Sequence, residues 1–249
     1  FETNEEVIKG PSESMSKSKK NVVDPENIIN EYGADTARLF MLSDSPPERD
    51  INWSISGING AWKFTQKFWR VVNSCEDIFT INLKEKPKEI KGDSNKFRKI
   101  VHKHLKSITD SIENFQMNVA VAKIHELTNE IGLLQKNDGI DKWCRKEALI
   151  ILLRVVEPIM PHLAEECWSL IGNSNSIIKE KWPQFDKSLL TDENATIIVQ
   201  INGKKRAELK MPTNSEEDIV FQNAMEIQSI SNLIVDHALI KKKKYCDCQ

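Results

Sequence analysis

The stretch that decides the fold runs from Ser54 to Val72 and reads SISGINGAWKFTQKFWRVV. Ser54 is a typical N-cap residue, because its hydroxyl can accept a hydrogen bond from the backbone of the first helical turn. Apolar residues then recur every three or four positions, which places them on one face of a helix. They are Ile55, Ile58, Trp62, Phe68, Trp69, Val72 and Phe79. The pattern predicts a long amphipathic helix whose opposite edge carries Lys63, Lys67 and Arg70.

Three later stretches show the same helical spacing of apolar residues, at 95–113, 118–135 and 141–170. Pro158 and Pro161 fall inside the last of them, and proline bends or breaks a helix because it has no backbone N–H. Short connections between amphipathic helices favour antiparallel neighbours. We therefore expect a mainly α fold built around a bundle of four helices.

The pattern changes near the C-terminus, where residues 197–211 form two runs suited to strands. Asn202-Gly203 joins them, and both residues tolerate a positive φ, so the pair predicts a two-residue hairpin. We expect a short helix to begin at Ser215 and a second one near 229–233. The apolar residues expected to pack the first are Ile219, Phe221 and Met225. A hairpin and two helices make a small α+β domain with too little sheet to be complete.

The two ends of the chain indicate a fragment. The chain begins with Phe1 rather than Met and ends with KKKKYCDCQ at 241–249. We interpret this tail as a truncation or a reading-frame artefact. A Cys-x-Cys metal or redox tail is the alternative.

Composition describes a soluble globular protein, with 39% hydrophobic and 29% charged residues among 249. The formal net charge of -2 excludes a protein that holds nucleic acid by its total charge alone, so any polyanion site must be local. Five scattered cysteines show no Cys-x-x-Cys spacing and are expected to be reduced thiols in the cytoplasm, without a zinc site. No apolar run approaches the ~20 residues of a membrane span.

A polar loop precedes the helices. Residues 10–21 read GPSESMSKSKKN and combine hydroxyls and ammonium groups with almost no apolar side chain. Lysines, hydroxyls and exposed backbone N–H groups suit a polyphosphate, although a solvated basic loop has the same composition. Asp24-Pro25 then predicts a helix start, Gly33 predicts its end, and Asp35 predicts the start of a second helix.

The order of these features resembles class I aminoacyl-tRNA synthetases. Met15–Ser18, Asn21–Pro25 and Tyr32–Leu39 together resemble the signature-loop region of that class. Within the class the chain looks like a bacterial leucyl enzyme, rather than a valyl, isoleucyl or methionyl one, because of Asn52–Ser54 and Gly57–Phe64. Pro158–Glu166, which is shared more widely in the class, and Val199–Lys204 add support.

The resemblance implies three parts: the end of a class I catalytic domain at 1–45, a helical-bundle tRNA-binding domain of the anticodon type at 46–180, and a small, incomplete α+β C-terminal domain at 190–249. It implies a ligase that activates leucine with ATP and transfers it to tRNA(Leu). Mg²⁺ would accompany ATP, and the complete enzyme would be a cytoplasmic monomer. The nucleotide-binding half, the leucine pocket and the editing domain are not found in this sequence, so this chain is expected to be inactive alone.

The resemblance also implies roles for the loop. Lys17 would be the mobile cation that neutralises charge on the leaving pyrophosphate, a contact made chiefly in the transition state. Ser16 and Ser18 would donate to phosphate or fix the loop, with Met15 and Ser14 beside ATP. Ser14 stands where the family has its first lysine, so a contact assigned to that lysine does not carry over.

The basic edge formed by Lys63, Lys67 and Arg70 is a candidate tRNA contact or a solvated surface. The same holds for a second group, at the hairpin turn: Lys204, Lys205 and Arg206.

The remaining conspicuous side chains are given structural roles. We expect His162 to pack or hydrogen-bond rather than act as a base, and His102 and His104 to point to different helix faces. The tryptophans are expected in the core or an interface before any base-stacking role: Trp53, Trp62, Trp69 and Trp168. Two other functions remain open, a free-standing RNA-binding helical module and a structural helical adaptor. Only the adaptor predicts no salt-dependent tRNA binding.

Overall fold

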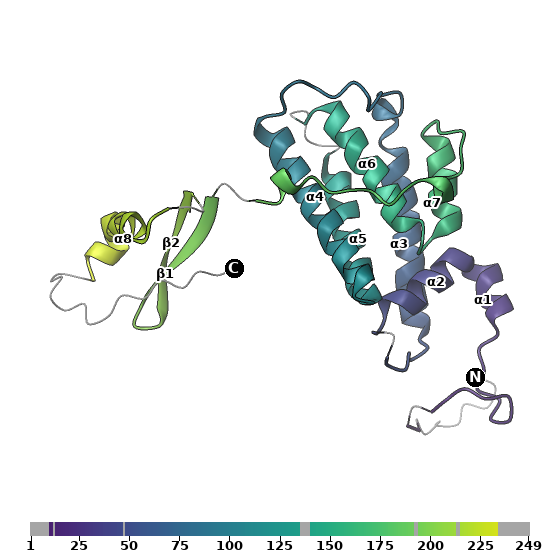
Figure 1. Cartoon of the computed structure of the whole chain (residues 1–249). Helices are drawn as coiled ribbons and strands as arrows, with labels where there is room; N and C mark the ends of the chain where they lie inside the picture. The colour runs from purple at the N-terminus through teal and green to yellow at the C-terminus, as the bar shows by residue number, and fades with distance from the viewer. Residues whose placement is uncertain are drawn as a thin grey trace. The chain divides into compact units, whose positions relative to one another are not determined.

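Figure 1 shows the computed structural model of the chain, which describes residues 10–11, 13–46, 48–134, 140–191, 194–212 and 215–233. The chain divides into two compact units, Phe1–Leu189 and Leu190–Gln249. The boundary expected at residue 45, between a catalytic and a tRNA-binding part, stays a prediction. The lysine-rich tail with Cys246 and Cys248 lies outside the described residues.

A two-helix corner opens the first unit, as the sequence predicts. Helix α1 spans Pro25–Tyr32, and the Asp24 carboxylate accepts a hydrogen bond from the Glu26 N–H at 3.0 Å. Gly33 ends it with a φ of +84°, a left-handed conformation that favours glycine. Helix α2 follows directly over Ala34–Ser43, so the corner is tight.

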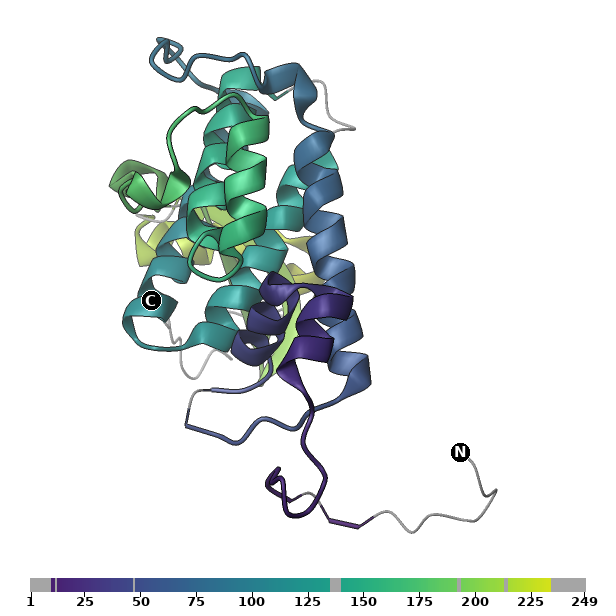
Figure 2. The same ribbon diagram turned by 90° about the vertical axis from the view of Figure 1, so that its right-hand side faces the viewer.

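Within the part of the chain that the structure describes, the bundle contains five helices rather than the expected four. They are α3 (Ile55–Asn73), α4 (Gly92–Glu113), α5 (Met117–Leu133), α6 (Lys142–Val156) and α7 (Pro161–Leu170). Pro158 and Pro161 divide the stretch expected at 141–170 into two helices, because a continuous helix would leave the residue before Pro161 sterically blocked. Figures 1 and 2 show α3 and α5 running side by side through the unit.

Helix α3 begins as predicted, since the Ser54 hydroxyl accepts from the Gly57 N–H at 3.0 Å. It ends at Asn73, and a short 3-10 turn at Glu76–Ile78 follows, so the expectation that one helix reaches Phe79 is wrong. Its core-facing stripe also differs from the predicted one. The buried residues are Ile58, Ala61, Phe64, Thr65, Phe68, Val71 and Val72.

Two tryptophans predicted on the apolar stripe of α3 lie at its margin instead. Trp62 is 37% exposed and Trp69 is 36% exposed, so neither belongs to the core. Trp53 packs its ring edge-on against Phe40 at 5.2 Å, and Trp168 is buried with the Arg154 guanidinium 6.0 Å from its ring. Trp168 is therefore a core residue and Trp53 packs against the core, whereas Trp62 and Trp69 lie outside it, and an interface role for these two stays a prediction.

A buried ion pair ties α4 to α6. Arg98 donates through Nε and Nη2 to the two carboxylate oxygens of Glu147 at 2.6 and 2.9 Å. The Arg98 side chain is 6% exposed and also lies over the Trp143 ring at 5.5 Å. Burial alone raises the pKa of Glu147, but the Arg98 hydrogen bonds, helped by His102, bring that pKa below its usual value.

The second unit contains the predicted hairpin, with β1 at Asn194–Ile201 and β2 at Lys204–Pro212. Asn202 and Gly203 have φ of +51° and +75°, which suits the predicted two-residue turn. An irregularity in the strand register falls between Val199 and Gln200.

Two helices follow the hairpin, α8 (Glu217–Glu226) and α9 (Gln228–Ser231). The residues buried on α8 are Val220 and Ala224, whereas the predicted Ile219 is 45% exposed. Phe221 and Met225 are only partly buried. The buried face of α8, which packs against β2, is therefore not the predicted one.

Three of the cysteines, Cys75, Cys144 and Cys167, are buried free thiols of the bundle. Burial raises the pKa of Cys144 to about 11 and that of Cys167 to about 12, so both are protonated at neutral pH. Among the described residues, no helix is both long and apolar enough to cross a membrane.

Replacing Glu147 with glutamine should lower the free energy of unfolding at pH 7 by about 3 kcal/mol, because Arg98 would stay buried without a counter-charge. The folded pKa of Glu147 is lowered, so its contribution is present above about pH 4.3, the ordinary glutamate value, and is lost as pH falls through the folded value. When urea unfolding is measured from pH 7 to pH 3, the free energy of unfolding should therefore fall less steeply in the variant than in the wild type.

The matched control is Asp93→Asn, which removes an exposed carboxylate paired with Lys96 on the same helix. It should leave the urea midpoint at pH 7 unchanged. A Glu147→Gln midpoint equal to that of the control would show that the buried pair contributes nothing.

Candidate functional site

The loop at 13–24 is closed by one side chain. The Asn21 carboxamide accepts from the Ser16 N–H at 2.7 Å and donates to the Ser14 carbonyl at 3.3 Å. Between these anchors the Lys19 and Lys20 N–H groups donate to the carbonyls of Ser16 and Lys17, both at 3.2 Å. The loop is thus a defined turn that extends from the start of α1 away from the bundle (Figure 2).

The cations of the loop are not equivalent. Lys19 forms an ion pair with Glu13, which ties its charge to the loop itself. Lys17 is exposed, and its ammonium group has no partner among the described residues. Ser16 and Ser18 bring their hydroxyl oxygens to 3.2 Å from each other, while the side chains of Met15 and Ser14 are exposed. Within the described residues, Lys17 and the exposed Lys20 are therefore the two cations of this turn that are free to contact an anion.

Helix α2 fixes this loop to the bundle at the break between α6 and α7. The Arg38 guanidinium donates through Nε to the Ile159 carbonyl at 3.0 Å and through Nη2 to the Pro158 carbonyl at 2.7 Å. Carbonyls that follow the end of a helix lack an intrahelical partner and carry partial negative charge. Arg38 satisfies two of them with a cation.

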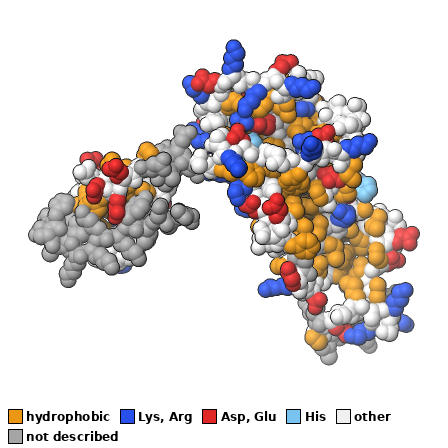
Figure 3. Space-filling model, viewed as in Figure 1, with side chains coloured by type: hydrophobic (Ala, Val, Ile, Leu, Met, Phe, Trp, Pro, Cys, Tyr) orange, Lys and Arg blue, Asp and Glu red, His pale blue; other side chains and the backbone are white. Residues whose placement is uncertain are grey.

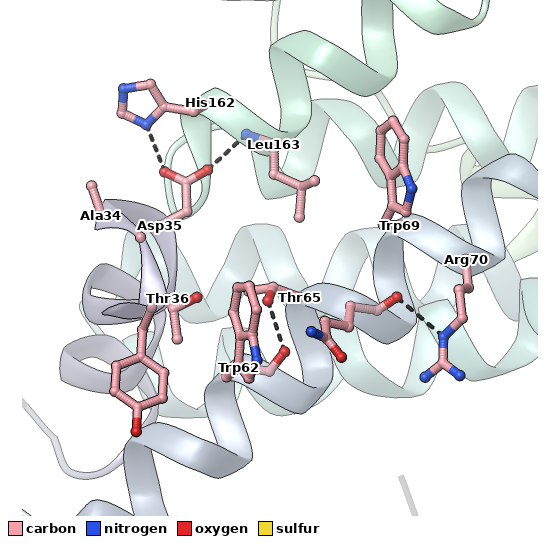
Figure 4. A pocket seen from close by; sticks show the side chains of 12 residues that line it. Ala34, Asp35, Thr36, Trp62, Thr65, Trp69, Arg70, His162 and Leu163 are labelled. Carbon is pink, nitrogen blue, oxygen red and sulfur yellow. Dashed lines mark hydrogen bonds and ion pairs between the residues drawn. The ribbon is translucent and has the colours of Figure 1, made fainter. Parts of the chain in front are cut away.

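One turn earlier on α2, Asp35 holds the other side of the same break. Its carboxylate accepts from the Leu163 N–H at 2.7 Å, in the first turn of α7, and lies 2.8 Å from Nδ1 of His162 (Figure 4). A carboxylate at a helix N-terminus is favourable because the N–H groups there are unpaired. His162 is 79% exposed and hydrogen-bonded, as expected from the sequence. We call Asp35 and Arg38 with the break at 158–163 the α2 clamp.

A hollow of about 810 Å³ lies beside the α2 clamp, where α1, α2, α3 and α7 meet (Figure 4). Its lining residues are Tyr32, Gly33, Ala34, Asp35, Thr36, Trp62, Thr65, Gln66, Trp69, Arg70, His162 and Leu163. Figure 3 shows hydrophobic side chains gathered on this face of the unit. We call this feature the α3 hollow.

The basic edge of α3 borders this hollow. Lys63 is exposed and has no partner among the described residues, whereas Lys67 hydrogen-bonds the Asn129 side chain. Arg70 is one of the residues that line the hollow, and its Nε donates to the Gln66 carbonyl at 3.3 Å. The three predicted cations thus share one helix edge, far from Lys17 in sequence.

The second basic group lies on β2, in the other compact unit. Lys204 and Arg206 are exposed, and Lys205 pairs with Glu208.

Helix α4 carries the two histidines that were expected to point to different faces. His102 is buried and its Nδ1 accepts from the Asp186 N–H at 3.1 Å, while Nδ1 of His104 lies 3.7 Å from the Glu126 carboxylate. Burial lowers the pKa of His104. No group of three metal-ligating side chains occurs among the described residues.

Neither the α2 clamp nor the α3 hollow is predicted from the sequence. Asp35 and Arg38 stand three positions apart, a spacing that places both on one helix face, but their partners are more than 100 residues away. Each exposed tryptophan of α3 is followed directly by a cation, Trp62 by Lys63 and Trp69 by Arg70, and this pattern is the signal that could have indicated the hollow.

Comparisons with known proteins agree on one family. Residues 95–221 match the family model described as the anticodon-binding domain of tRNA ligase. Residues 6–54, which include the loop, match the model described as class I tRNA synthetases for I, L, M and V.

The similar curated proteins are leucine–tRNA ligases. A leucine–tRNA ligase of Parvibaculum lavamentivorans is 42% identical over 92% of this chain and 26% of its own length. One of Paramagnetospirillum magneticum is 44% identical over 90% of this chain and 26% of its own length. A LeuRS–tRNA–LeuAMS ternary complex from Agrobacterium radiobacter K84 superposes with a TM-score of 0.78 at 27% identity, covering 93% of this chain and 30% of that chain. The chain therefore spans about a quarter of the length of these curated relatives.

Replacing Asp35 with alanine should lower the free energy of unfolding by about 1–2 kcal/mol, because the Leu163 N–H and the His162 ring lose their acceptor. Hydrogen exchange should localise the effect, with faster exchange of the Leu163 amide. Asp44→Ala, at the opposite end of α2, is the control and should leave both readouts unchanged. Unchanged exchange at Leu163 in the Asp35 variant would contradict the capping role.

Proposed function

We infer from the family to which this chain belongs, the anticodon-binding domains of tRNA ligases, that it is part of an ATP-dependent leucine–tRNA ligase. In this proposal the loop before α1 contacts ATP and the bundle binds tRNA(Leu). The unpartnered ammonium of Lys17 on a turn that Asn21 closes is the observation that carries the ATP role. The identity of 42–44% to leucine–tRNA ligases supports leucine over the other amino acids of the class.

The proposed first step is the formation of leucyl-adenylate. A leucine carboxylate oxygen attacks the α-phosphorus of ATP, and the bond from that phosphorus to the bridging oxygen of pyrophosphate breaks. Negative charge grows on the leaving pyrophosphate, so a cation that contacts it in the transition state lowers the barrier. Lys17 is free to move toward that charge, whereas Lys19 is held by Glu13. Ser16 and Ser18 would donate hydrogen bonds to phosphate or hold the turn.

Met15 and Ser14 precede these groups, and their exposed side chains would lie along ATP. Mg²⁺ is proposed to arrive with the nucleotide, because it binds phosphate oxygens and keeps several waters. The leucine pocket is proposed to lie elsewhere in the complete ligase, and this chain alone should not form the adenylate.

The proposed second partner is tRNA(Leu), bound along the edge of α3. Lys63, Lys67 and Arg70 lie at intervals of four and three residues, so their charges follow one edge of the helix. Helix α3 contains no acidic residue, so nothing on it opposes a phosphate backbone. Lys204, Lys205 and Arg206 are a second proposed contact, with Lys205 the weakest member because of its Glu208 pair.

We also propose that the complete ligase is a cytoplasmic monomer. The three buried thiols of the bundle support a reducing compartment. A free-standing RNA-binding module would use the same α3 edge but would not need Lys17, so the loop distinguishes the two functions.

In the full-length ligase that contains this chain, Lys17→Ala should slow leucine-dependent ATP–pyrophosphate exchange by about tenfold to a hundredfold. The physical reason is the loss of one charge-assisted contact made in the transition state, about 1.5–3 kcal/mol. Ser14→Ala is the control on the same loop and should change the rate by less than about threefold. Equal, small effects of both substitutions would contradict the role of Lys17.

For tRNA binding, Lys63→Gln should weaken the complex of this chain with a tRNA(Leu) transcript and reduce the salt slope of log K by about one unit, since one phosphate contact is lost. The control is Lys106→Gln on α4, whose ammonium is paired with Asp110. Its slope should equal that of the wild type. Identical slopes for all three proteins would remove Lys63 from the RNA contact.

A further inference from the structure

Two parallel rows of side chains run along the exposed side of α3. Trp62, Gln66 and Trp69 form one row and line the α3 hollow. Lys63, Lys67 and Arg70 follow each of them by one position and form the neighbouring row. Residues four and seven apart lie on one face of a helix, so each row is continuous in space. An aromatic row therefore lies directly beside a cationic row.

The aromatic row is accessible. Trp62 and Trp69 each expose more than a third of their surface, although a tryptophan buries more area than most side chains and would stabilise the fold if it were covered. Trp62 meets Tyr32 edge-to-face with ring centroids 6.4 Å apart, while Trp69 has no ring partner among the described residues. Trp69 thus presents an unoccupied aromatic surface to the hollow.

The polar groups at the margin of the hollow suit the edge of a base. Gln66 carries a side-chain donor and acceptor, and the Arg70 guanidinium has donors that its bond to the Gln66 carbonyl does not use. At the opposite side Asp35 is already occupied by the Leu163 N–H and His162. The volume of about 810 Å³ lies within the range of small-molecule pockets and leaves room for one nucleotide.

We propose that the α3 hollow holds one unstacked nucleobase of the RNA that the basic edge of α3 binds, with the base stacked on Trp69. This inference rests on the proposed tRNA function and assigns a site within it. The cationic row holds the phosphates on either side of the base, and Trp62 forms the far wall. Because a duplex keeps its bases stacked inside, the nucleotide comes from a loop, bulge or single-stranded segment.

Charge decides between RNA and a protein segment as the occupant. Helix α3 carries three cations and no acid along its whole length, and Lys63 has no partner among the described residues. An apolar protein segment could pack on the tryptophans equally well, but it would make no favourable ionic contact with the cationic row. Stacking on aromatic side chains next to cations is the combination that single-stranded nucleic acid uses.

The test uses the full 249-residue chain labelled with 5-fluorotryptophan and a tRNA(Leu) transcript. The six tryptophan signals are assigned with single substitutions, and the signals of Trp62 and Trp69 should shift on saturation with RNA while that of buried Trp168 stays in place. Affinity and its salt slope are measured in parallel by fluorescence anisotropy of the labelled transcript.

Trp69→Leu should weaken binding about tenfold, since stacking of one base on an aromatic side chain contributes this much or more, and the salt slope should stay as in the wild type because no phosphate contact is lost. Trp69→Tyr retains an aromatic ring and should stay within about threefold of the wild type. Phe115→Asn is the matched control, because Phe115 is 61% exposed at the turn between α4 and α5, and asparagine suits its φ of +61°.

The outcomes separate this site from the broader function. No salt-dependent binding of the wild-type chain would contradict the proposed tRNA function and the nucleobase site together. Salt-dependent binding with unmoved Trp62 and Trp69 signals, or with equal affinities for the wild type and Trp69→Leu, would leave the function standing and overturn the nucleobase site. The hollow would then belong to a protein partner. An unchanged Trp168 signal in each variant confirms that the bundle is folded.

Discussion

The α2 clamp is the contact on which the arrangement of the first unit depends. Proline at 158 and 161 interrupts the bundle and leaves carbonyls without partners on one side of the break and N–H groups without partners on the other. Arg38 meets the carbonyls and Asp35 meets the Leu163 N–H, so each charge has the sign that the adjacent helix end favours. A break that would weaken a helix in isolation becomes the attachment point for α2.

This attachment gives the loop a fixed base. Only α1 and the tight Gly33 corner separate the loop from α2, so the end of the loop that enters α1 is held against the bundle. The turn itself is closed locally by Asn21, which leaves Lys17 without a partner among the described residues. A cation that is needed only in a transition state is best left unpaired in the ground state, because an ion pair formed beforehand would have to be broken. Lys19, paired with Glu13, shows the contrasting case on the same turn.

The sequence predicted those features that depend only on interactions between neighbouring residues. Asp24-Pro25, Gly33 and Asn202-Gly203 predicted their caps and turn because each acts on its own backbone. The helices of the bundle followed from spacing, but the buried stripe of α3 did not, because which face is covered depends on neighbours such as α2 and α5. The α2 clamp joins residues more than 100 positions apart, and no local pattern specifies such a pair. The roles of Lys17 and the two basic groups remain predictions.

Helix α3 has a buried side and an exposed side, and the composition of each has a different physical explanation. Its buried side is filled with aliphatic and phenyl groups packed against the bundle, which accounts for its stability. Its exposed side places two tryptophans beside three cations, and stability does not require this arrangement, since polar residues there would satisfy a solvated helix equally well. Burial of an indole surface is favourable only when something covers it. A cationic row beside exposed indoles is the combination on which single-stranded nucleic acid binds, with phosphates at the cations and bases stacked on the aromatic rings, and the proposed nucleobase site rests on that match.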